Sequence, residues 1–147
     1  MTIEEMNLEP IAKNAATILQ SKHPTIEFTS GRRGIFQQAH AMAGNVVKKR
    51  DWIGRTYLAG AKLQAWIDRH PQAKTVDEIT VGLVQEMKAM PEEELVKISR
   101  HLTGRAFDVR PVTANAKAIK ADILNLPGLH KFLEKEGGLV RWHAQFK

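Results

Sequence analysis

A short stretch around residue 100 combines a histidine and an aspartate at a spacing that suits metal binding. Residues 99–108 read S-R-H-L-T-G-R-A-F-D and fit the pattern S-x-H-x-x-G-x-A-x-D at every fixed position. Imidazole and carboxylate are common zinc donors, and three protein ligands with one open position for water characterise catalytic zinc sites. A third candidate, His143, lies near the C-terminal end. His101, Asp108 and His143 are therefore candidate ligands of one Zn²⁺ ion, and a structural role for each histidine is the alternative that the residues alone leave open.

The chain must bend between His101 and Asp108 if both are to reach one ion. Positions seven residues apart are separated by about 10 Å on a straight helix and by about 23 Å on a straight strand, whereas each donor must lie about 2 Å from the metal. Thr103-Gly104 is the one place between them with turn chemistry. Residues 106–109 then alternate as a strand does. We expect a loop followed by a strand.

Composition indicates a single globular domain, residues 1–147, that is large enough to bury a core without cross-links. Hydrophobic residues make up 43% of the chain and charged residues 26%, which is ordinary for a globular protein. Cysteine is absent, so disulfides and thiolate metal sites are excluded. Histidine and carboxylate side chains remain as the strong metal ligands.

The net charge of +6 favours a polyanionic partner such as nucleic acid, anionic lipid or an anionic cell-wall polymer. No helix-turn-helix, zinc-finger or RNA-binding signature is present, so nucleic acid is not the expected partner. The acidic N-terminus, residues 1–9, lacks the apolar stretch of a secretory signal, and no apolar run reaches the length of a membrane span. We expect a monomer that is made in the cytoplasm without a signal peptide or transmembrane segment.

Hydrophobic periodicity predicts an α+β fold, a single domain in which helices pack around a small antiparallel sheet carrying the zinc site. Gly137-Gly138 is expected to end the last helix. The predicted helices are about 10–21, 35–48, 56–69, 75–90, 114–124 and 127–136, with a helical turn at 91–96, and the predicted strands are 25–30, 106–109 and 139–146.

Three segments together resemble the zinc D-Ala-D-Ala metallopeptidases of peptidoglycan, which share their site with lysostaphin-type enzymes and the hedgehog signalling domain. Residues 28–33, F-T-S-G-R-R, are similar to the family's T-S-G-x-R segment. Residues 99–108 match the first metal motif, and residues 142–145, W-H-A-Q, resemble the last one. The resemblance covers roughly residues 25–147. It implies that Arg33 binds substrate and that the three candidate ligands hold the zinc.

The general base is not where the family usually has it. Many members carry a glutamate three residues before the last ligand, where this chain has Val140, and others carry a histidine two residues before it, where this chain has Arg141. The base must then come from elsewhere. We favour Glu136, beside the Gly137-Gly138 turn, with Glu134 and His130 as alternatives.

The function that the resemblance implies is zinc-dependent hydrolysis of an amide bond in the stem peptide or cross-link of peptidoglycan. A small basic chain without a signal or a separate wall-binding domain is typical of a bacteriophage endolysin, which reaches the cell wall after the membrane is permeabilised, or of a virion-associated hydrolase. Val140 in place of glutamate leaves an alternative, a catalytically inert zinc-stabilised module that binds the wall or builds the virion.

Overall fold

The computed structural model describes all 147 residues, which separate into two compact units. Unit 1 consists of Met1–Arg32 and Thr103–Lys147, and unit 2 consists of Arg33–Leu102. Helices and one four-stranded antiparallel sheet confirm the predicted α+β class. No helix combines the length and the apolar composition that crossing a membrane would require. The single domain of residues 1–147 stays a prediction.

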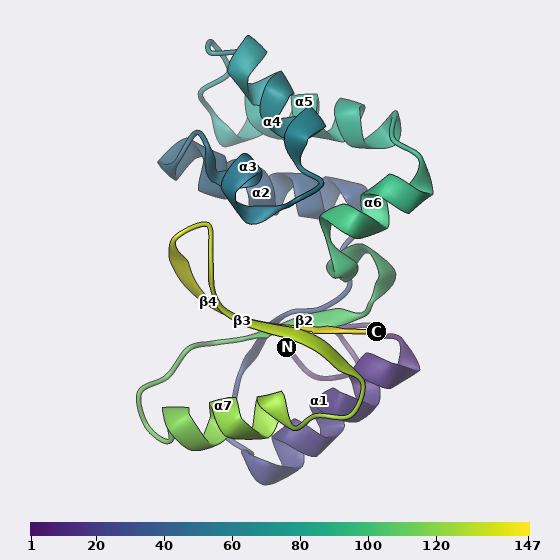
Figure 1. Cartoon of the computed structure of the whole chain (residues 1–147), viewed down its shortest axis with the longest axis vertical. Coiled ribbons are helices and arrows are strands. Elements are labelled where there is room, and N and C mark those ends of the chain that lie inside the picture. The colour runs from purple at the N-terminus through teal and green to yellow at the C-terminus, as the bar shows by residue number, and fades with distance from the viewer. The chain divides into compact units, whose positions relative to one another are not determined.

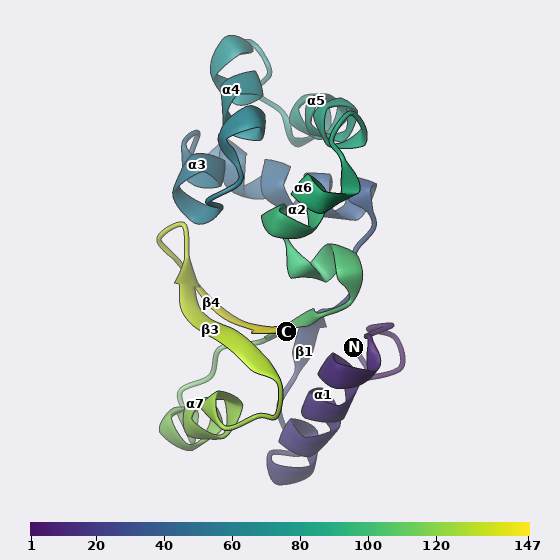
Figure 2. The same cartoon turned by 45° about the vertical axis from the view of Figure 1, so that its right-hand side comes forward.

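Unit 1 contains the sheet and two helices that lie against one of its faces (Figures 1 and 2). All strand pairs are antiparallel, in the order β1-β2-β4-β3. The first helix begins at Pro10, a residue favoured in the first helical turn because its ring fixes φ and its missing N–H costs no hydrogen bond. The elements are α1 (Pro10–Lys22), β1 (Phe28–Ser30), β2 (Ala106–Val109), α7 (Ala116–Leu124), β3 (Leu129–Glu136) and β4 (Leu139–Phe146).

The core of unit 1 lies between the sheet and these two helices. Alternate residues of β2 and β4, among them Phe107, Trp142 and Phe146, join Leu19 of α1 and Ile123 of α7 in one buried apolar cluster. Successive side chains of a strand point to opposite faces of its sheet. The residues between these apolar positions therefore point to the face that α1 and α7 do not cover.

The predicted helix over residues 127–136 is wrong, because this segment forms β3. Its apolar residues Leu129, Phe132 and Leu133 have helical spacing, but pairing with β4 overrides that local signal. Gly137 and Gly138 do not end a helix. Their φ angles of 57° and 88° are both positive, as a two-residue type I′ hairpin turn requires, and they join β3 to β4.

Unit 2 is helical (Figure 2), and the most extensive packing within it is between α2 (Ile35–Lys48) and α5 (Val76–Lys88). Thr75 caps α5, since its side chain accepts a hydrogen bond from the Glu78 backbone N–H. The helix expected over 56–69 is shorter and begins after a turn at Gly60. The remaining elements are α3 (Trp52–Thr56), α4 (Ala61–Arg69), α6 (Glu92–Ile98) and the 3₁₀ turn η1 (Arg100–Thr103).

Candidate metal centre

Asp108 and His143 face each other across β2 and β4, on the face of the sheet opposite to the apolar core. They are directly opposed in the register of the two strands, so their side chains project to the same side. The His143 Nδ1–H donates to Asp108 Oδ1 at 2.8 Å, and Nε2–H donates to Gln145 Oε1 at 3.0 Å. The side chains are only 6% and 13% exposed for His143 and Asp108. The pair is preformed and largely dry.

The surroundings of His143 hold a proton on its ring. Burial by itself lowers the pKa of an imidazole, but here the hydrogen bond to Asp108 and the charges of Asp108 and Glu136 outweigh it and raise the pKa from 6.5 to about 9. Both ring nitrogens face acceptor oxygens, which agrees with a doubly protonated ring. A metal bound by His143 must displace this proton, because only the unprotonated nitrogen has a lone pair to donate.

His101 lies in η1, where local hydrogen bonds fix its backbone. Its N–H donates to Ser99 Oγ at 3.2 Å, and its carbonyl accepts from the Arg33 N–H at 2.9 Å. The expected bend before β2 is confirmed at Gly104, whose φ of 75° is a left-handed conformation that glycine adopts readily. A side chain at Gly104 would also collide with the Arg32 guanidinium. The motif therefore forms a turn followed by a strand, as predicted.

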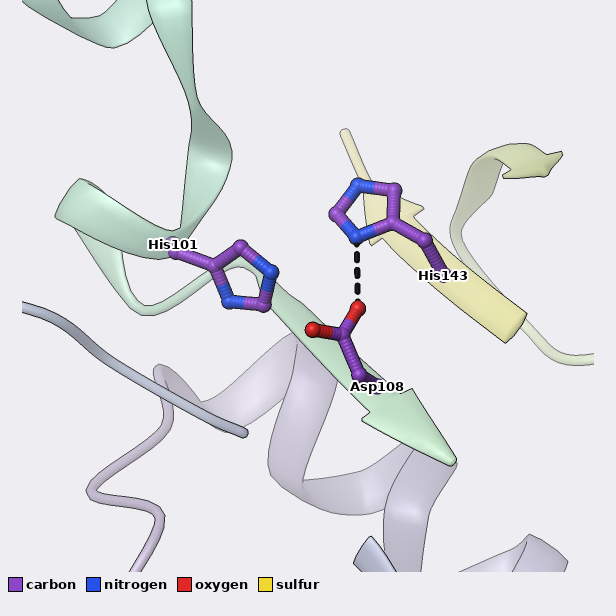
Figure 3. A group of neighbouring side chains, drawn as sticks. All are labelled: His101, Asp108 and His143. Atoms are coloured by element: carbon purple, nitrogen blue, oxygen red, sulfur yellow. Dashed lines mark hydrogen bonds and ion pairs between the residues drawn. The ribbon is translucent and has the colours of Figure 1, made fainter. Parts of the chain in front are cut away.

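The three predicted ligands form one group of donors (Figure 3). The ligand atoms of His101, Asp108 and His143 all lie within 4.8 Å of one another, and the two histidines are buried. Tetrahedral zinc with bonds of about 2 Å holds its ligand atoms about 3.3 Å apart, so small side-chain rotations would close the shell. Two imidazoles and one carboxylate are a donor set that zinc accepts. The group could hold a metal ion.

The three candidate bases differ in their surroundings. Glu136, at the end of β3, places Oε1 3.9 Å from His143 Nδ1, and its side chain is 14% exposed. Glu134 instead forms a 2.6 Å ion pair with Lys120 of α7, the helix that packs on the other face of the sheet. His130 is exposed on β3. Among these three residues, it is Glu136 that an ion pair links to the metal group.

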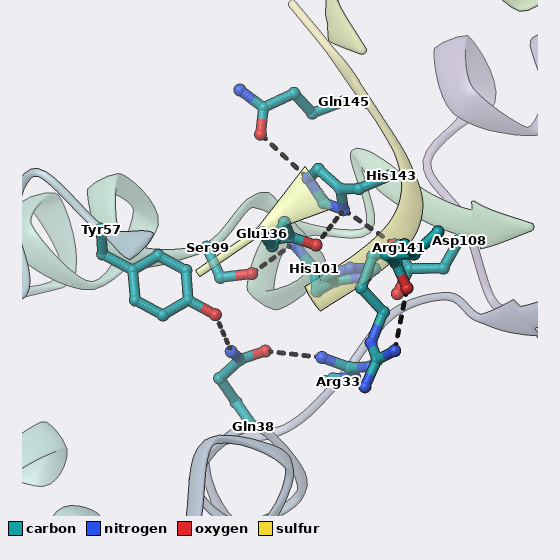
Figure 4. A network of polar contacts seen from close by, with 11 residues as sticks. Arg33, Gln38, Tyr57, Ser99, His101, Asp108, Glu136, Arg141, His143 and Gln145 are labelled. Atoms are coloured by element: carbon teal, nitrogen blue, oxygen red, sulfur yellow. Dashed lines mark hydrogen bonds and ion pairs between the residues drawn. The ribbon is translucent and has the colours of Figure 1, made fainter. Parts of the chain in front are cut away.

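Arg33 is held by a polar chain within unit 2 (Figure 4). Its Nη1 donates to Gln38 Oε1 at 3.4 Å, and Gln38 Nε2 donates to the Tyr57 hydroxyl at 3.4 Å. Gln38 is fully buried although it is polar, which such partners make tolerable. Because the Arg33 N–H also binds the His101 carbonyl, the guanidinium extends from a backbone tied to a candidate ligand.

Sequence reasoning missed Gln38, Tyr57 and Gln145 in these contacts. Gln145 was detectable, because it stands two residues after His143 and so projects from β4 on the same face. No local pattern marks the contact of Gln38 with Tyr57, which joins residues 19 positions apart. Val140, in the place of the family's glutamate, is an exposed residue of β4, and the neighbouring Arg141 donates to the Val140 carbonyl.

No protein-family model, curated protein or solved structure matches this chain.

Proposed function

We propose that this protein is a zinc-dependent peptidoglycan peptidase of the endolysin type, which hydrolyses an amide bond of the stem peptide or cross-link. The observation that carries the proposal is the position of Glu136 beside a preformed group of three zinc-type donors. A donor group alone would suit an inert structural ion. A largely buried carboxylate next to it, without a role in the packing of the core, supports hydrolysis.

The chain's own residues suit each part of amide hydrolysis. When bound, zinc would polarise the scissile carbonyl and lower the pKa of a bound water from 15.7 towards about 7. Glu136 accepts a proton from the attacking water and later delivers it to the leaving amine. Arg33, oriented by Gln38, presents a guanidinium that can bind a substrate carboxylate through two parallel hydrogen bonds. The net charge of +6 draws the protein to anionic wall material.

The test is digestion of purified peptidoglycan sacculi by wild type, Glu136→Gln and Glu134→Gln. We expect zinc-loaded wild type to release peptides and a chelator to stop the release. Glu136→Gln should lower the rate by roughly 10²- to 10⁴-fold, as expected for loss of a general base. Glu134→Gln is the matched control, because it removes the neighbouring carboxylate on the other face of the sheet and should keep the wild-type rate.

The outcomes separate the proposal from its alternative. Masses of the released peptides identify the bond that is cut, either L-Ala–D-Glu or D-Ala–diaminopimelate. Release that continues under chelation would contradict the metallopeptidase. Zinc binding with no release of peptides by any form would instead indicate the inert zinc-stabilised module. An unchanged rate in Glu136→Gln would remove the assigned base but keep the peptidase.

A further inference from the structure

Ser30, in the T-S-G segment, has a buried hydroxyl that lacks a hydrogen-bond partner. The residue is 7% exposed, and no protein atom accepts from or donates to its Oγ. A buried polar group in this state is unfavourable, and most buried hydroxyls have a partner. The position of Ser30 in the sheet indicates which group its hydroxyl could bind.

A β-bulge turns Ser30 to the face of the metal group. Phe28 pairs with Val109, and both are buried in the core of unit 1. One extra residue in β1 then shifts the register, so that Ser30 pairs with Asp108 rather than with Phe107, its partner in a regular antiparallel ladder. Directly opposed residues project to the same face with Cβ atoms about 4.5–5.5 Å apart. The register therefore places Ser30 and Asp108 on the same face of the sheet, where a movement of the two side chains could bring the hydroxyl to the carboxylate.

Binding of a metal changes what Asp108 needs from its surroundings. In the structure, one Asp108 oxygen accepts a hydrogen bond from His143, while His143 uses its other nitrogen on Gln145. To ligate, His143 must withdraw a ring nitrogen from one of these bonds, and Asp108 must turn an oxygen to the metal. Ligating carboxylates are themselves held by hydrogen bonds from neighbouring groups, which fix their orientation.

We propose that Ser30 is a positioning residue of the metal centre, whose hydroxyl donates to the Asp108 carboxylate in the metal-bound protein. The hydroxyl has no hydrogen-bond partner within the protein and would gain one when Asp108 becomes a ligand. This inference rests on the metal site of the proposed function and not on peptidase activity. Gly31 supports the arrangement, because a side chain there would collide with Met6, and the end of β1 is therefore closely packed.

The test compares Ser30→Ala with wild type in two measurements, zinc affinity by competition with a chromophoric chelator and urea unfolding of the metal-free protein. We expect zinc affinity to fall about 10- to 100-fold, the range for losing a group that supports a ligand. The metal-free variant should unfold at the same or a higher urea concentration, since it loses an unsatisfied hydroxyl. Thr29→Ala, at the exposed neighbouring position of β1, should change neither value.

Three results would overturn the inference. Zinc affinity within twofold of wild type in Ser30→Ala would show that Asp108 does not use the hydroxyl. A lower unfolding midpoint of the metal-free variant would show that the hydroxyl already stabilises the metal-free fold. Absence of zinc binding by wild type would remove the site itself. If zinc affinity behaves as expected but no peptide is released from sacculi, the proposed peptidase fails while the role of Ser30 stands.

Discussion

The two faces of the sheet in unit 1 are built from alternating residues of the same strands, yet they carry different chemistry. On β2, Phe107 joins the apolar core, and its neighbour Asp108 pairs with His143 on the opposite face. His143 is 5% exposed and Phe107 is 0% exposed, so burial does not distinguish the two faces at these positions. The polar face is tolerated because Asp108, His143 and Gln145 are hydrogen-bonded to one another. One face supplies stability, and the rigid strands position the ligands of the other.

The largest effect on stability is expected for Phe107→Ala, on the apolar face. The Phe107 ring contacts Phe28 edge-on and Phe146 at a tilt, with ring centroids 5.3 Å apart in both pairs. Truncating a fully buried phenylalanine to alanine costs about 3–5 kcal/mol of unfolding free energy, since the cavity does not close completely. Urea unfolding of the metal-free protein measures the loss. A loss below about 1 kcal/mol would show that the core of unit 1 does not depend on this face.

The next largest effect is expected from Asp108→Asn, on the same strand and the other face. The asparagine amide has nearly the same shape and can still accept from His143, but it lacks the charge that raises the pKa of His143 to about 9, so the unfolding free energy of the metal-free protein at neutral pH should fall by about 1–3 kcal/mol. Zinc affinity should fall about 100-fold or more, equivalent to about 2.7 kcal/mol, because a neutral amide oxygen is a much weaker ligand than a carboxylate. Chelator competition measures the affinity.

Nuclear magnetic resonance of the metal-free variant supplies the control. Removing the Asp108 charge should move the pKa of His143 down from about 9 towards its ordinary value of 6.5. A variant that lowers this pKa but keeps the wild-type zinc affinity would contradict the assignment of Asp108 as a ligand. A variant as unstable as Phe107→Ala would show that the polar face, too, serves mainly stability.

The sequence predicted the elements that local signals determine. The bend at Gly104 and the alternation in β2 lie within ten residues of each other, so the motif of residues 99–108 was sufficient to group His101 with Asp108. The bounds of α2 were also predicted correctly. Segment β3 was predicted as a helix because strand pairing, which decided its structure, depends on a partner that the local pattern does not contain.

The same limit applies to the side chains that support the site. Ser30 and Asp108 lie 78 positions apart in the chain, and they face each other only because a bulge in β1 shifts the pairing of that strand with β2. Glu136 was favoured from the idea of a flexible turn at a helix end. Its position beside His143 comes instead from a strand that ends in a tight hairpin. The sequence was enough to predict that Glu136 lies near the candidate ligands, but not the strand and hairpin that place it there, and its role as the base stays a prediction.

The smallest effect is expected at the hairpin that positions Glu136, where Gly138→Ala should separate the base from the ligands. Gly138 has a φ of 88°, and placing a Cβ in a left-handed conformation costs about 1–2 kcal/mol. Glu136 pairs with Leu139 directly at this turn, whereas His143 pairs with Leu133 well inside the hairpin. We expect a lower rate of peptide release with zinc affinity close to wild type.

Gly137→Asn is the control. Asparagine tolerates the φ of 57° at this position, and Asn-Gly is a favoured type I′ turn, so this variant should keep both the rate of peptide release and the zinc affinity of wild type. An equal loss of zinc affinity and rate in Gly138→Ala would mean that the turn holds the whole polar face, and that base and ligands are not separable within the sheet.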